Sequence, residues 1–115
     1  MRNEEHYLQV SMVNWFNYQY PKMKYNLFAV PNGQNKSIQQ AKYFKSEGLK
    51  SGVSDLIFCL NGKTTFIEVK TGKGKQSPTQ KEFEKEMEKN NFDYYIVRDL
   101  DEFRSVIETE LITNI

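Results

Sequence analysis

Two acids and a lysine lie where the sequence would otherwise form buried strands. Asp55 directly precedes the apolar run that ends at residue 60. Glu68 lies near the end of the next run, residues 63–69, and Lys70 directly follows that run. An acid followed two residues later by lysine is common on exposed strands, so Glu68 and Lys70 alone would favour a solvated face. Adding Asp55 changes that interpretation if the two strands bring the acids together.

The turn between these strands predicts that they do. Residues 61–62, Asn-Gly, are the strongest short signal for a two-residue hairpin. Pairing outward from that turn sets Asp55 directly opposite Glu68, with Cβ atoms ~5 Å apart, a destabilising placement for like charges. Lys70 projects from the same face as Glu68, because side chains alternate along a strand. We therefore expect two carboxylates and an ammonium to converge.

A divalent cation would relieve the repulsion between the two acids. Magnesium and manganese prefer oxygen ligands, keep several waters and are often held by one or two carboxylates together with substrate phosphates. The sequence offers no cluster of histidines and cysteines, which argues against zinc. Lys70 could orient an attacking water or stabilise charge on the phosphorus. Such a site suits metal-assisted hydrolysis of a phosphodiester.

Periodicity and turn residues predict the elements that position these side chains. We expect helices at 4–19, 37–48, 78–90 and 99–111, and strands at 25–30, 53–60, 63–69 and 92–98, with a turn at 31–33. Serines with glutamine three residues later mark the second and third helix starts. The hairpin strands are apolar on both faces, so the expected fold is one α/β domain, residues 1–115, with a small mixed sheet flanked by helices.

Composition allows a soluble globular domain of 115 residues, 38% hydrophobic and 27% charged. A single cysteine, Cys59, excludes an internal disulfide framework. With no apolar leader pattern in the first residues, we expect a cytoplasmic protein. The net charge of +1 conceals an asymmetry, since residues 1–81 carry twelve Lys and Arg against five acids, and residues 82–115 carry four against ten. That division permits a basic face for a polyanion.

Several stretches together resemble one known family. Residues 52–56, the hairpin, residues 67–75 and residues 77–80 are similar to the virus-type replication-repair nuclease domain, VRR-NUC, of the PD-(D/E)xK nuclease superfamily. Upstream, residues 30–33 and 41–52 also resemble that family. The resemblance covers nearly the whole chain and therefore suggests a stand-alone member with a restriction-endonuclease-like core. One departure is Ser54, where the family usually has proline before the aspartate, and it removes no ligand.

The resemblance implies Mg²⁺- or Mn²⁺-dependent cleavage of DNA, often branched or flapped DNA such as four-way junctions. It also implies an acid on the first helix. Glu4 and Glu5 lie at similar angles to the apolar stripe, so periodicity does not choose between them. The family pattern of glutamate followed four residues later by glutamine matches Glu5 and Gln9, and we select Glu5 with Glu4 as the alternative. The metal set that the resemblance implies is Glu5, Asp55, Glu68 and Val69.

Gln80 and several lysines complete the predicted site. Gln80 matches a family position; it could cap its own helix, hold water or phosphate near the metal, or do both. Lys73 and Lys75 alternate with glycines in a loop that could meet the DNA backbone, although the loop lacks the pattern of a Walker motif. Weaker candidates for phosphate contact lie on and after the second helix: Lys36, Lys42, Lys45 and Lys50.

Two other classes of function stay open at this level. The chain could be a module that keeps the fold and binds DNA without cutting it, although a binder has no need to tolerate the repulsion between Asp55 and Glu68. It could also be a structural subunit of a replication or packaging assembly. The resemblance points to a homodimer, because two symmetric sites suit a substrate with two strands to cut.

Overall fold

The computed structural model describes residues 3–31 and 37–114. Helices and strands alternate in the order expected for an α/β domain. The elements are α1 (Asn3–Gln19), the short 3₁₀ helix η1 (Pro21–Met23), β1 (Leu27–Ala29), α2 (Ile38–Ser46), β2 (Leu56–Leu60), β3 (Lys63–Val69), α3 (Pro78–Lys89), β4 (Asp93–Val97) and α4 (Leu100–Thr113). Apart from η1, this is the predicted sequence of elements.

The four strands form one mixed sheet in the order β1-β2-β3-β4. β1, β2 and β3 pair antiparallel, and β4 lies parallel to β3. Parallel neighbours cannot be joined by a tight turn, so the chain crosses over from β3 to β4 through α3. This crossover places the start of α3 beside the far end of β3, where Glu68 and Lys70 lie.

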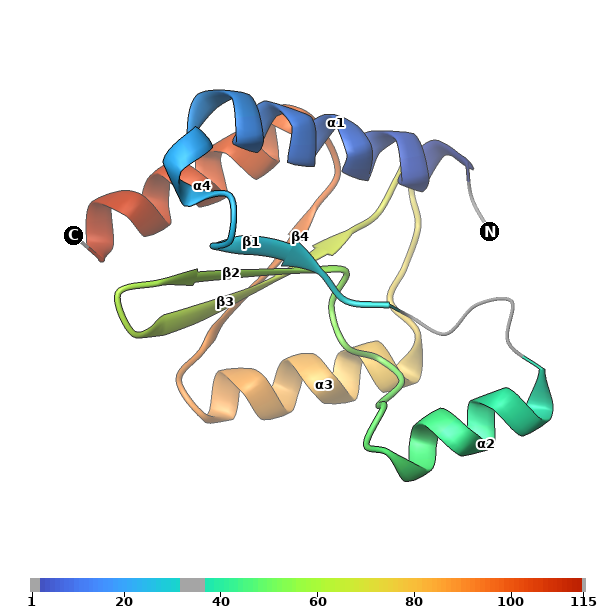
Figure 1. Ribbon diagram of the computed structural model, residues 1–115. Coiled ribbons are helices and arrows are strands. Elements are labelled where there is room, and N and C mark those ends of the chain that lie inside the picture. The colour runs from blue at the N-terminus through green and yellow to red at the C-terminus, as the bar shows by residue number, and fades with distance from the viewer. Residues whose placement is uncertain (1–2, 32–36, 115) are drawn as a thin grey trace.

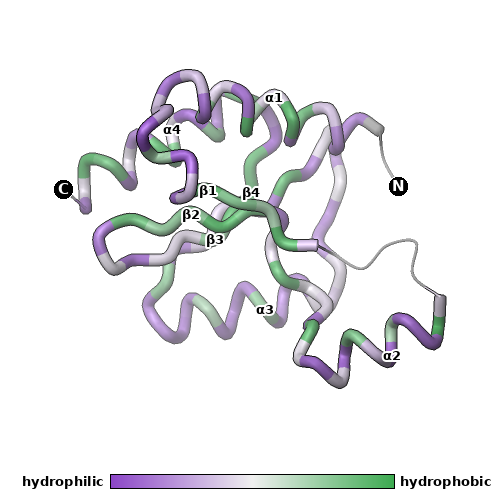
Figure 2. Tube along the Cα trace, viewed as in Figure 1, coloured by the Kyte–Doolittle hydropathy of each residue, from purple (hydrophilic) through white to green (hydrophobic). Residues whose placement is uncertain are grey.

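Helices cover the sheet on both faces. α1 and α4 pack on one face and α3 on the other (Figure 1). The main core lies under α1 and α4, where Phe16 meets Phe58 with ring centroids 5.6 Å apart. A smaller cluster forms under α3, where Phe66 contacts Phe83 and Phe92. The trace of β1 and β2 is mostly hydrophobic, whereas hydrophilic and hydrophobic residues alternate along the helices (Figure 2).

The hairpin has the predicted register. Asn61 and Gly62 both have positive φ, at 50° and 84°, as the expected two-residue turn requires. Leu60 faces Lys63, and the ladder continues to the pair of Leu56 with Ile67. The prediction that the first strand of the hairpin begins at residue 53 was wrong, because β2 starts at Leu56 and residues 53–55 lie outside the ladder.

Helix caps follow the sequence closely. Ser37 and Gln40 form a complete capping box at the start of α2, and Ser77 and Gln80 form another at α3. Asp99 accepts a hydrogen bond from the Glu102 backbone and begins α4. The predicted turn at residues 31–33 lies largely outside the described residues.

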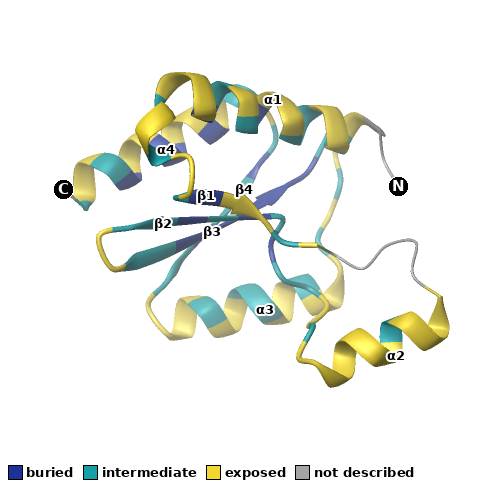
Figure 3. Cartoon of the chain, viewed as in Figure 1, coloured by how far each residue is buried: buried dark blue, intermediate teal, exposed yellow. Residues whose placement is uncertain are grey.

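One helix stands apart from the packed body. α2 extends away from the sheet, and its side chains are exposed almost throughout (Figure 3). Ile38 and Tyr43 are large apolar side chains left accessible to solvent on it. Within the described residues, the helices are too short or too polar for any of them to cross a membrane.

Candidate active site

A glycine and a buried serine shape the chain just before Asp55. Gly52 has φ +88°, and a Cβ on it would lie 2.4 Å from the carbonyl oxygen of Thr79, which only glycine tolerates. The start of β2 thus lies against the first turn of α3. Ser54 is fully buried, and its hydroxyl donates to the Leu56 carbonyl at 3.0 Å. No local pattern predicts the contact between Gly52 and Thr79, because it joins residues 27 positions apart.

Asp55 is fastened to the neighbouring strand by its side chain. It lies one residue outside the ladder, and its Oδ2 accepts a hydrogen bond from the Val69 backbone at 2.8 Å. Its own carbonyl accepts from the Val30 backbone at 3.0 Å. These bonds fix the carboxylate beside the end of β3 and next to Glu68. The structure therefore brings Asp55, Glu68 and Val69 together, as predicted.

Glu68 is a buried acid with an unsatisfied oxygen. Its residue surface is only 2% exposed, and its Oε1 has no hydrogen-bond partner among the described residues. Burial raises the pKa of the Glu68 carboxyl to about 8, helped by the charge of Asp55 and opposed by Lys70. Ionisation of Glu68 is thus disfavoured both by its burial and by the neighbouring acid.

Lys70 and Gln80 connect this acid to α3. The Lys70 ammonium lies 3.5 Å from Glu68 Oε2 and donates to Gln80 Oε1 at 3.0 Å. The Gln80 amide nitrogen donates to Glu68 Oε2 at 3.1 Å, while its oxygen also accepts from the Ser77 backbone at 2.8 Å. Gln80 therefore caps its helix, as one of its two predicted roles requires, and it also binds Glu68, a contact that the sequence did not predict.

The first-helix acid lies close to the site without joining a cluster. Glu4 is exposed, whereas Glu5 is half-buried. A Cβ built on Gly74 would lie 3.8 Å from Glu5 Oε2 and 3.7 Å from Lys70 Cδ, so Glu5 faces the loop beside Lys70. In the described parts of the chain, however, no three His, Cys, Asp or Glu side chains gather closely enough to hold a metal together.

The predicted DNA-contacting lysines fall into two groups. Lys73 and Lys75 are exposed on the loop between β3 and α3, next to Lys70. Lys50 lines a pocket of about 170 Å³ with Asp55 and Gln80. The remainder of that pocket consists of Pro31, Ser51, Gly52, Val53 and Ser77.

Lys42 and Lys45 are exposed on α2, the helix that precedes Lys50 in the chain. Lys36 lies outside the described residues. Within this region, Ser77 is a contributor that the sequence identified solely as a helix cap. Its backbone N–H holds the Gln80 oxygen, and the residue lines the pocket.

Comparison with known proteins identifies the family and the fold. The VRR-NUC domain model matches residues 1–99. A solved structure described as a VRR_NUC domain protein superposes with a TM-score of 0.77 at 26% sequence identity, covering 91% of this chain and 85% of that one. No curated protein matches. The matched segment includes every residue of the candidate site, from Glu5 to Gln80, and the chain belongs to the VRR-NUC family of nuclease domains.

Proposed function

We propose that this protein is a Mg²⁺- or Mn²⁺-dependent deoxyribonuclease that hydrolyses phosphodiester bonds at the Asp55–Glu68 site. Membership of a nuclease family supports the reaction class. The observation that carries the proposal is the buried, unpartnered Oε1 of Glu68 next to a second carboxylate. Buried polar atoms are nearly always satisfied, so an orphan acceptor beside another acid calls for a cation.

The donor set fits a hard divalent cation. Asp55 and Glu68 offer carboxylate oxygens, and the sequence contains only one histidine and one cysteine, too few for a soft-ligand site. Asp55 and Glu68 would hold the ion, with the Val69 main chain and Glu5 as the remaining proposed contributors. When bound, Mg²⁺ or Mn²⁺ would supply Lewis-acid polarisation of the phosphate and lower the pKa of a bound water.

The chain's own groups orient the reactants. The Lys70 ammonium is held by Gln80 Oε1 and Glu68 Oε2, so its position is fixed before substrate arrives. A lysine held in this way can stabilise negative charge as it develops on the phosphoryl oxygens. Gln80 keeps Glu68 and Lys70 in register through its two ends. Lys50, Lys73 and Lys75 would hold flanking phosphates.

For the substrate and assembly, we propose branched DNA and a homodimer. A domain of 115 residues presents little surface to a junction, whereas two copies present two sites. The exposed Ile38 and Tyr43 of α2 provide apolar surface that a second copy could cover. Light scattering at working concentration gives the number of copies, and a fully active monomer would contradict the dimer.

Cleavage of labelled DNA tests the nuclease. Purified wild type and Asp55→Ala are incubated with four-way junctions, flaps, single strands and plain duplex in Mn²⁺. We expect Asp55→Ala to lose at least about 100-fold in rate, because metal stabilisation of the transition state is worth several kcal/mol. Asp101→Asn, which removes an exposed acid on α4, is the matched control and should cut normally. Wild-type cleavage no better than Asp55→Ala on every substrate would refute the proposal and favour a non-cutting DNA-binding module.

A further inference from the structure

The loop that carries Lys73 and Lys75 is tied to the end of β4 by Arg98. The Arg98 guanidinium Nη1 donates to the Gly72 carbonyl at 3.0 Å, across 26 residues of sequence. Gly72 has φ +51°, and the Gly74 N–H closes a turn on the Thr71 carbonyl at 2.9 Å. The guanidinium thus attaches to the loop at the residue before Lys73.

Arg98 is itself fixed from two sides. The Lys70 N–H donates to the Val97 carbonyl at 3.1 Å, which extends the parallel pairing of β3 and β4 to the residue before Arg98. The Arg98 N–H donates to Glu102 Oε1 at 2.7 Å, within the capped start of α4. The anchor of the loop therefore stands on a strand end and a helix start.

A second attachment holds the other end of the loop. The Gln76 amide nitrogen donates to Glu84 Oε1 at 2.9 Å and to the Tyr94 hydroxyl at 3.3 Å. Between the two attachments, Gly74 passes the carboxylate of Glu5 and the stem of Lys70. The path of residues 72–76 is consequently set by side chains from outside the loop.

We propose that Arg98 is a positioning residue for DNA binding: it holds residues 72–75 so that Lys73 and Lys75 present their ammonium groups to the DNA backbone. The proposal rests on the nucleic-acid substrate of the proposed function, and it assigns Arg98 an action through the lysines and no contact of its own with DNA. A flexible loop would bring the same charges to the phosphates only after losing conformational entropy.

A binding cycle tests this assignment. The Kd for labelled DNA is measured in Ca²⁺, a hard cation with the same preference for oxygen ligands, for wild type, Arg98→Ala, the pair Lys73→Ala/Lys75→Ala, and all three changes together. We expect Arg98→Ala to raise Kd roughly 5- to 10-fold and to flatten the salt dependence. In the lysine-free background the same change should have almost no effect. Arg98→Lys, which keeps a donor for Gly72, should recover part of the loss.

Two further measurements separate the possible outcomes. Hydrogen exchange at the Gly74 amide should be faster in Arg98→Ala, while the rest of the sheet and the melting temperature stay unchanged. Lys89→Ala, which removes an exposed cation at the far end of α3, is the charge control. Equal losses from Arg98→Ala with and without the lysines, or unchanged Gly74 exchange, would overturn the positioning role. A protein that binds DNA in this assay yet cuts none in Mn²⁺ would refute the nuclease and leave the role of Arg98 standing.

Discussion

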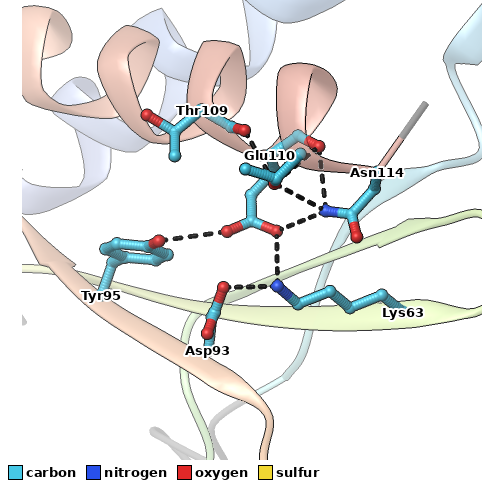
Figure 4. A network of polar contacts seen from close by, with 7 residues as sticks. Lys63, Asp93, Tyr95, Thr109, Glu110 and Asn114 are labelled. Atoms are coloured by element: carbon cyan, nitrogen blue, oxygen red, sulfur yellow. Dashed lines mark hydrogen bonds and ion pairs between the residues drawn. The ribbon is translucent and has the colours of Figure 1, made fainter.

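The sheet buries two glutamates, one toward each end of β3 and on opposite faces, and their surroundings differ completely. Glu110 of α4 is 1% exposed, and both its oxygens are satisfied. Its Oε2 accepts from the Tyr95 hydroxyl at 3.0 Å, and its Oε1 accepts from Asn114 at 3.0 Å and lies 3.2 Å from the Lys63 ammonium (Figure 4). Glu68 is 2% exposed, and its Oε1 has no partner among the described residues.

The neighbouring charges differ in the same way. The Lys63 ammonium donates to Asp93 at 2.5 Å and also contacts Glu110, so one cation is shared between these two acids. The pKa of Lys63 is raised and that of Asp93 is lowered, mainly by their mutual hydrogen bond. At the other site, burial and the neighbouring Asp55 raise the pKa of Glu68, and Lys70 offsets that rise only in part.

The two buried glutamates differ in whether their hydrogen bonds are complete. Burial alone does not distinguish Glu68 from Glu110. A carboxylate whose partners complete its hydrogen bonds stabilises one packed arrangement, whereas a carboxylate left incomplete beside another acid costs stability that some bound group must recover. Three experiments test whether the difference is real.

The largest expected effect falls on the satisfied acid. Glu110→Ala leaves Tyr95 and Asn114 without their acceptor and Lys63 with Asp93 alone, and each polar group left without its partner typically costs about 1–3 kcal/mol. Urea denaturation should show the sum of these losses in the free energy of unfolding. Cleavage per folded molecule should stay normal, because the network is remote from Asp55. Glu108→Ala, an exposed acid on the same helix, should change stability by less than about 0.5 kcal/mol.

A smaller effect, of opposite sign, is expected for the unsatisfied acid. Glu68→Gln removes an acid whose ionisation is disfavoured by burial and by Asp55, so the metal-free protein should be as stable as wild type or more so. Wild type should gain about 2.7 kcal/mol from Mn²⁺ at 100 times its Kd, and the variant should gain far less. Thermal melts with and without Mn²⁺ measure both quantities. A metal-free loss comparable with that of Glu110→Ala would mean that the two acids do not differ in kind.

Measured per pH unit, the smallest effects lie in the pH dependence of the metal-free protein. Glu68 has its pKa raised from 4.5 to about 8 in the folded state, so its contribution to stability is complete below 4.5 and is lost as pH rises to 8. That slope is at most about 1.4 kcal/mol per pH unit and should vanish in Glu68→Gln.

Asp93 has the opposite sign, since its lowered folded pKa gives stability that is present above 3.8 and lost as pH falls further. The effect should be weak because the Asp93 side chain is 40% exposed, and Asp93→Asn should remove it. Melting curves from pH 3 to pH 9 separate the effect of Asp93 at low pH from that of Glu68 at higher pH. Matching slopes of stability against pH for Glu68→Gln and wild type above pH 5 would contradict the prediction for Glu68.

Local signals in the sequence predicted most of the elements. The Asn-Gly turn specifies its own backbone angles and therefore the register of β2 and β3. The capping boxes at Ser37 and Ser77 involve residues three apart and form as expected. The start of β2 was placed too early, because the approach to Asp55 is controlled by contacts with α3 and not by local propensity.

The partners of Glu110 and the loop anchor at Arg98 had no signal in the sequence. Glu110 continues the buried stripe of α4, three residues after Ile107, but the groups that bind its carboxylate, Lys63 and Tyr95, arrive from two different strands. Arg98 follows a strand as many exposed arginines do, and its bond to Gly72 exists because β4 lies parallel to β3. Neither contact is encoded by spacing along the chain.

The sequence by itself determined that Asp55 and Glu68 meet, since a two-residue turn and the alternation of side chains leave one pairing that keeps the apolar residues inside. Only the tertiary structure decided which groups form hydrogen bonds and ion pairs with these two acids. The crossover helix places Gln80 against Glu68 and Lys70, and the Val69 N–H at the end of β3 donates to Asp55. The packing leaves Glu68 Oε1 without a partner among the described residues. Such contacts depend on how whole helices and strands pack together. That packing is determined by the burial of the entire core, so no short stretch of sequence predicts it.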